Sequence, residues 1–129
     1  MNEKVRLWMD YAKDDLAFAK SGMEDGYYSH ACYLSQQCME KVLKGFLVAQ
    51  DKQYPKSHDL VRLYKLCGSP EWLGDIVDDL SFASLAYIPM RYPDAMPGTL
   101  PDRDPTEKDA RLMLDLAENG RGLNFIEPN

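Results

Sequence analysis

The chain has 129 residues, 45% hydrophobic side chains and a formal net charge of −6, which is enough for one domain with a substantial core, here residues 1–129. Its acidic residues gather toward the C-terminus, so it lacks the basic surface with which proteins hold duplex DNA, although a local contact to a nucleotide or an RNA end stays open. No run approaches the roughly 20 apolar residues of a membrane span. Charges interrupt the first ten residues, which predicts no secretory leader and a cytoplasmic protein.

The first amphipathic helix is predicted from about Glu3 to Lys20, because apolar residues recur there at three- and four-residue steps. The pair Ser21-Gly22 follows as a break, and Asp25 is the expected N-cap of the next helix. A connection this short implies that the two helices lie antiparallel.

The longest helix is expected over Tyr27–Lys52, about 25 residues without an internal proline. One arc of this helix carries apolar side chains and is expected to face the core. The facing arc, named here the polar arc, holds most of its hydrogen-bonding side chains: His30, Tyr33, Gln36, Gln37, Glu40, Lys41 and Lys44. The polar arc is therefore the first place to look for function.

Two further helices are expected in the middle of the chain. Ser57 is the predicted N-cap of a short helix over His58–Leu66. The pair Ser69-Pro70 then starts a third long helix, which should end near residues 89–91.

The last helix follows a proline-rich surface loop over residues 93–105 and is expected to start within Asp104-Pro105-Thr106-Glu107, with Glu107 at position N3. Its core stripe should contain Ala110, Met113, Leu116 and Ala117. No segment alternates with a period of two residues, so no strands are expected. The predicted fold is all-α, an up-and-down four-helix bundle with one additional short helix.

The three cysteines, Cys32, Cys38 and Cys67, show no CxxC spacing and are interpreted as reduced core residues. The chain has only two histidines, so a zinc site has almost no support. We expect neither a metal nor another cofactor.

Four motifs follow one another along the chain: Trp8-x3-Ala12-x2-Asp15-Leu16-x2-Ala19; Tyr28-x2-Ala31 leading to Gln37-x2-Glu40-Lys41-x2-Lys44; Ser57-His58-Asp59-Leu60; and Arg91-Tyr92-Pro93-Asp94. Together they resemble the HEPN domain (higher eukaryotes and prokaryotes nucleotide-binding) over about residues 4–120. The resemblance implies an all-α bundle, frequent homodimers, and small prokaryotic genes that often lie beside one for a minimal nucleotidyltransferase.

The resemblance also implies two functional subclasses, one of which comprises metal-independent ribonucleases with an Arg followed, after four to six residues, by a His. That signature is missing here. The positions to be filled before His58 hold Asp51, Lys52 and Gln53, and none of those before His30 is Arg. Lys52 could stand in, although Lys does not give the bidentate phosphate contact of Arg, and acid–base cleavage needs a positioned cation.

Six residues form the candidate ligand site: Gln37, Lys41, Lys44, His58, Arg91 and Tyr92. The first three share one stripe and could bind a phosphate and a base edge; the alternatives are a solvated face with a Glu40–Lys44 pair, or a dimer interface. His58 either binds an anion in the first helical turn or anchors the connection. Arg91 beside Tyr92 either clamps a nucleotide or only ends a helix and fills a packing gap.

The sequence therefore predicts a HEPN-like homodimer that recognises a nucleotide or RNA without being an enzyme itself, in a toxin–antitoxin-like pair with a separately encoded minimal nucleotidyltransferase. Two alternatives stay open. A divergent metal-independent ribonuclease would use His30 or His58 with a substitute cation. A purely structural subunit would use the polar arc as a dimer or partner interface.

Overall fold

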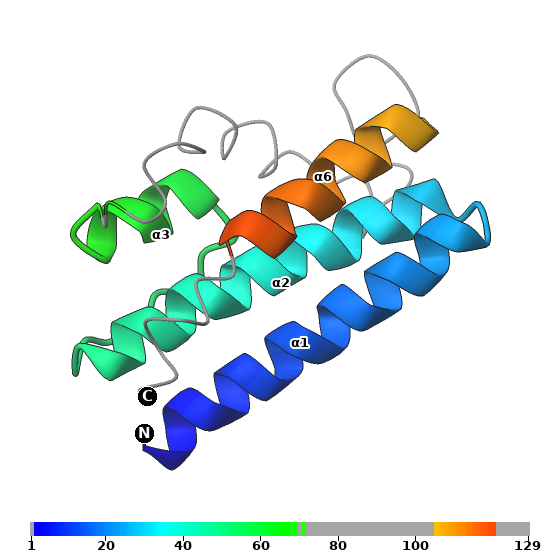
Figure 1. The fold of residues 1–129 in the computed structure, drawn as a ribbon. Coiled ribbons are helices and arrows are strands. Elements are labelled where there is room, and N and C mark those ends of the chain that lie inside the picture. The colour runs from blue at the N-terminus through cyan, green and yellow to red at the C-terminus, as the bar shows by residue number, and fades with distance from the viewer. Residues whose placement is uncertain (1, 70, 72–104, 121–129) are drawn as a thin grey trace.

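The computed structural model describes residues 2–69, 71 and 105–120, and these contain four α-helices and no strand. The helices are α1 (Glu3–Glu24), α2 (Tyr28–Ala49), α3 (Leu60–Leu66) and α6 (Glu107–Gly120). Figure 1 shows α1 and α2 antiparallel, with α6 lying along both and α3 beside the C-terminal half of α2. The predicted all-α fold is confirmed, whereas the third long helix and most of the proline-rich loop fall outside the described residues.

The first helix runs about one turn further than the sequence predicts. Its N-cap is Asn2, whose side-chain oxygen accepts a hydrogen bond from the Val5 amide at 2.9 Å. The helix continues through Gly22, because the next residue, Met23, is only 8% exposed and adds apolar surface to the core. Asp25 is the C-cap of α1 and not the N-cap of α2, so that prediction was wrong.

The second helix has 22 residues, the same length as α1, so it is not the longest helix as predicted. It starts at Tyr28 without a side-chain cap. It ends at Ala49 because Asp51 adopts a φ of 58°, a left-handed conformation that stops a helix. The amides of Asp51 and Lys52 then turn back onto carbonyl groups of the last helical turn.

The short helix α3 begins at Leu60, two residues later than predicted, because its N-cap is Asp59 and not Ser57. The Asp59 carboxylate accepts hydrogen bonds from two amides of the first turn, at 3.0 and 3.3 Å. Ser57 Oγ instead accepts a hydrogen bond from the Asp59 amide at 3.1 Å. His58 consequently lies in the turn that precedes the helix and not in its first turn.

The last helix, α6, is capped by Thr106 and Asp109. The amide and hydroxyl of Thr106 both donate to the Asp109 carboxylate, at 2.9 and 3.0 Å, and the Asp109 amide donates to Thr106 Oγ1 at 3.3 Å. This is the reciprocal pattern of a capping box. Glu107 is the first helical residue and not N3, and it accepts a hydrogen bond from the Tyr28 hydroxyl at 3.3 Å.

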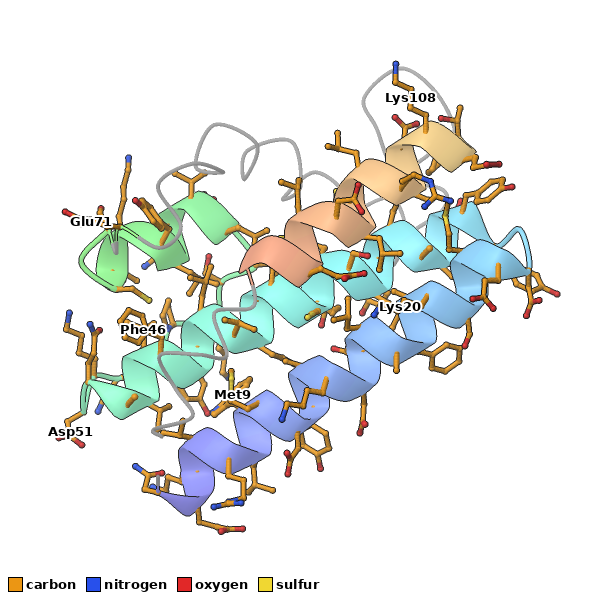
Figure 2. All side chains as sticks on the ribbon, viewed as in Figure 1. Met9, Lys20, Phe46, Asp51, Glu71 and Lys108 are labelled. Carbon is orange, nitrogen blue, oxygen red and sulfur yellow. The ribbon has the colours of Figure 1, made fainter. Side chains whose placement is uncertain are left out.

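The core lies between α1, α2 and α6. Figure 2 shows Met9 between α1 and α2, and this side chain is 2% exposed. The predicted core stripe of α6 is confirmed, and all three cysteines are buried free thiols, as predicted. None of the described helices is long and apolar enough to cross a membrane.

One glycine permits the close contact between α1 and α2. A Cβ atom on Gly45 would lie 3.0 Å from the Cβ of Trp8 and 3.2 Å from the end of the Met9 side chain. These distances are shorter than ordinary van der Waals contacts. The position of Trp8 against α2 therefore depends on the missing side chain at Gly45.

Candidate functional site

The centre of the polar arc is buried. Gln36, Glu40 and Lys44 expose 0, 5 and 6% of their surface, whereas Gln37 and Lys41 are half-buried. The turn that leads into α3 lies over the arc, since the Gln36 amide donates to the His58 carbonyl oxygen at 3.1 Å. The interpretation of this centre as a solvated face is therefore wrong, although the expected Glu40–Lys44 pair is present.

Glu40 is the centre of a polar cluster at the junction of α2 and α3. Its carboxylate oxygens lie 2.8 Å from Lys44 Nζ and 2.9 Å from His58 Nδ1. The side-chain amides of Gln36 and Gln37 donate to the same carboxylate at 3.4 Å each. A buried carboxylate is stable only when it is paired and hydrogen-bonded. These five residues are named the Glu40 cluster.

Within the Glu40 cluster, His58 reaches furthest toward solvent. Its side chain is 43% exposed, whereas those of Glu40 and Lys44 are 7 and 8% exposed. The backbone of His58 is tied to α2 through the Gln36 side chain, and Gln36 is itself held by the Gln37 amide at 2.7 Å. The imidazole is therefore fixed both by its ring nitrogen and by its own backbone.

Lys41 points to the other side of α2 and forms an ion pair with Asp15 of α1. The two side chains are 24 and 17% exposed. Burial raises the pKa of the Asp15 carboxyl above its ordinary value of 3.8, and Lys41 acts against this rise. Both lysines of the predicted stripe therefore carry an internal carboxylate partner.

Of the six predicted site residues, the structure brings together Gln37, Lys44 and His58, and places Lys41 on the α1 side of the polar arc. Arg91 and Tyr92 lie outside the described residues. Sequence reasoning did not include Glu40 or Gln36 among the site residues, although both belong to the polar arc.

The two other groups considered for nuclease chemistry contact different partners. Lys52, considered as a substitute for the signature Arg, donates to the Leu66 carbonyl at the end of α3 at 3.0 Å. His30 is exposed, as predicted, and its ring lies edge-on to Tyr27 with centroids 6.4 Å apart. Among the described residues, no three His, Cys, Asp or Glu side chains are grouped to hold a metal ion.

A groove of about 1030 Å³ opens between the start of α1 and the chain that follows α2. Its aromatic residues are Trp8, Tyr11 and Tyr54. The rings of Trp8 and Tyr54 pack edge to face, with centroids 5.0 Å apart and planes at 79°. Lys44 Nζ lies 5.9 Å from the centroid of the Tyr54 ring, so Tyr54 connects the groove to the Glu40 cluster.

Comparisons with known proteins agree on one family. A family model described as the HEPN domain matches residues 5–121. The curated protein named "Putative toxin MJ1304", from Methanocaldococcus jannaschii, is 27% identical over 124 residues, which cover 89% of this chain and 82% of that protein. Two crystal structures are similar: TT1696 from Thermus thermophilus (TM-score 0.76, 32% identity, 93% and 94% coverage) and ST0689, described as an archaeal HEPN homologue (TM-score 0.73, 33% identity, 95% coverage of both chains).

Proposed function

This chain belongs to the HEPN domain family, and we propose that it is the HEPN member of a toxin–antitoxin-like pair and recognises a nucleotide or an RNA end in the cytoplasm. The family match and the likeness to the M. jannaschii protein support the toxin–antitoxin part of the proposal. The proposed assembly is a homodimer, and the proposed partner is a separately encoded minimal nucleotidyltransferase.

The contact between His58 and Glu40 carries the recognition part of the proposal. A buried carboxylate oxygen lies 2.9 Å from Nδ1 of an imidazole that is 43% exposed. Such a carboxylate favours the tautomer with the proton on Nδ1 and fixes the plane of the ring. A ring with one orientation and one tautomer is suited to a directional hydrogen bond with a phosphate or a base.

The charges of the site favour recognition over catalysis. Lys44 pairs with Glu40, and Lys41 pairs with Asp15, so a phosphate bound here would share each lysine with a carboxylate. Cleavage of a phosphodiester needs strong stabilisation of the charge that develops in the transition state. We therefore assign to Gln37, Lys41, Lys44 and His58 the role of ligand contacts, with Arg91 and Tyr92 as further phosphate and stacking contacts.

A divergent ribonuclease is the second candidate, because the same contact favours it. An imidazole oriented by a carboxylate is the arrangement that general acid–base catalysis uses. Lys44, at 2.8 Å from Glu40, would then be the substitute cation. Its 8% exposed side chain makes this role less suitable than recognition.

Binding of a labelled single-stranded RNA of about ten nucleotides, measured by fluorescence anisotropy, tests the proposal. The His58→Ala and Lys41→Ala proteins should bind about 10-fold more weakly than wild type, because each loses a charged or directional hydrogen bond. Lys20→Ala is the matched control, since Lys20 forms only an exposed ion pair with Glu118. Unchanged affinity in both test variants would contradict the site.

The same RNA also separates the two candidates. Incubation in EDTA followed by gel analysis should leave it intact if the protein only recognises RNA. Cleavage that His58→Ala abolishes would establish the ribonuclease instead. Co-expression with a neighbouring nucleotidyltransferase gene, followed by co-purification, tests the partner.

A further inference from the structure

The groove at the start of α1 gathers exposed aromatic side chains that the proposed function does not yet use. Tyr11 is 57% and Tyr54 45% exposed, and Trp8 is half-buried between them and α2. Large exposed rings collected in one hollow are unusual for packing and typical of a binding surface. Aromatic side chains bind unpaired bases by stacking, with little dependence on which base is present.

Charge in this groove runs opposite to the charge of the whole protein. Lys4, Lys52 and Lys56 line it together with two carboxylates, those of Glu3 and Asp51, which leaves a local net charge of +1 in a chain of net charge −6. No ion pair within the described part of the chain involves Lys4 or Lys56. Exposed rings beside available ammonium groups match the bases and phosphates of a single strand.

The groove is held in place and leads to the Glu40 cluster. Gly45 allows Trp8 to lie against α2, and Trp8 in turn packs against the edge of Tyr54. The Tyr54 ring then meets Lys44, which pairs with Glu40. Asp51, labelled in Figure 2 at the end of α2, marks the outer side of this continuous surface.

We propose that this groove is a stacking subsite for unpaired bases of single-stranded RNA, and that the strand continues from it toward His58. The inference rests on the proposed function and extends it, because it names a ligand class and a path. Trp8, Tyr11 and Tyr54 supply the stacking surfaces. Lys4 and Lys56 supply phosphate contacts at the outer end of the groove.

Tryptophan fluorescence and RNA anisotropy test this subsite. The chain has two tryptophans, so a Trp72→Phe protein reports on Trp8 alone, and its emission should be quenched by the single-stranded RNA of about ten nucleotides. Tyr11→Ala should weaken RNA binding about 10-fold, because one stacking contact is lost. Phe18→Ala is the matched control, since Phe18 lies on the same helix, is 67% exposed and does not line the groove.

Salt dependence gives a second, independent readout. The Lys4→Ala/Lys56→Ala protein should lose about 1.4 from the slope of log affinity against log salt concentration, because two phosphate contacts are removed from a single strand. Both variants change exposed side chains, so loss of folding does not explain a weaker affinity. An unchanged slope together with unchanged Tyr11→Ala affinity would overturn the proposal.

The outcomes also distinguish this inference from the proposed function. If the wild-type protein binds no RNA, both fail. If binding requires His58 but neither Tyr11 nor the two lysines, the proposed function stands and the stacking subsite is wrong. If Tyr11→Ala changes only the mass of the protein in solution, the groove is a contact between protein chains and the RNA subsite is likewise wrong.

Discussion

Two adjoining regions on one side of α2 handle their charges in opposite ways. In the Glu40 cluster, Glu40 and Lys44 are buried and paired with each other. In the groove, lysines and aromatic rings stand at the surface, and Lys44 below the Tyr54 ring is the point where the regions meet. The lysines whose spacing suggested a phosphate site are thus largely satisfied within the protein, while the side chains available to a ligand come mainly from α1 and the segment after α2.

The largest expected effect tests whether the Glu40 cluster is a structural requirement. Glu40→Ala leaves Lys44 as a buried charge without its partner, and should lower the free energy of unfolding by about 3–5 kcal/mol. Urea denaturation at neutral pH measures this difference. A Glu40→Ala/Lys44→Met protein should recover most of the loss, because no charge then remains buried.

The matched control for Glu40→Ala is Glu118→Ala. Glu118 pairs with Lys20 at 3.5 Å, but the two side chains are 42 and 48% exposed. Its removal should change the free energy of unfolding by about 1 kcal/mol or less. Equal losses in the two proteins would mean that burial does not distinguish the Glu40 cluster from an ordinary surface pair.

The next effect concerns the wall of the groove. Gly45→Ala adds a Cβ that would lie 3.0 Å from the Cβ of Trp8, so α1 and α2 must separate, at a cost of about 1–3 kcal/mol in the free energy of unfolding. The emission of Trp8 should shift as its packing loosens. Gly22→Ala is the control, because its nearest neighbour is 3.6 Å away, and it should be neutral or up to about 1 kcal/mol stabilising.

The sequence predicts the helices better than it predicts their ends. Apolar periodicity located α1, α2, α3 and α6, because the residues that face the core recur at the helical period. The ends depend on single backbone conformations and caps, such as the left-handed Asp51. Where two cap residues stand close together, as Ser57 and Asp59 do, the sequence alone does not say which of them starts the helix.

The candidate site was predictable only as a stripe on a helix. Spacing placed Gln37, Lys41 and Lys44 on the polar arc, but it carries no information about what covers the arc. The turn before α3 folds back over Gln36 and Glu40, so the burial of Lys44 follows from a contact between distant segments. The groove was missed for the same reason, because Trp8 and Tyr54 meet only in the folded chain.

The smallest expected effect lies at Asp15, whose ion pair with Lys41 joins α1 to the polar arc. Burial raises the pKa of this carboxyl above 3.8, with Lys41 opposing the rise. An acid with a higher pKa in the folded protein binds its proton more tightly when folded, so the free energy of unfolding falls as pH rises from about 4 through the folded pKa. Asp15→Asn should remove this fall.

Urea unfolding of wild type and Asp15→Asn at intervals between about pH 4 and pH 7 measures the effect of Asp15. The wild-type protein should lose stability relative to Asp15→Asn across this range, whereas Asp10→Asn, an exposed change on the same helix, should run parallel to wild type. The opposite slope would show that the attraction of Lys41 outweighs the burial of Asp15. Lys41 would then be a firmly held structural lysine, and its assignment as a ligand contact would have to be withdrawn.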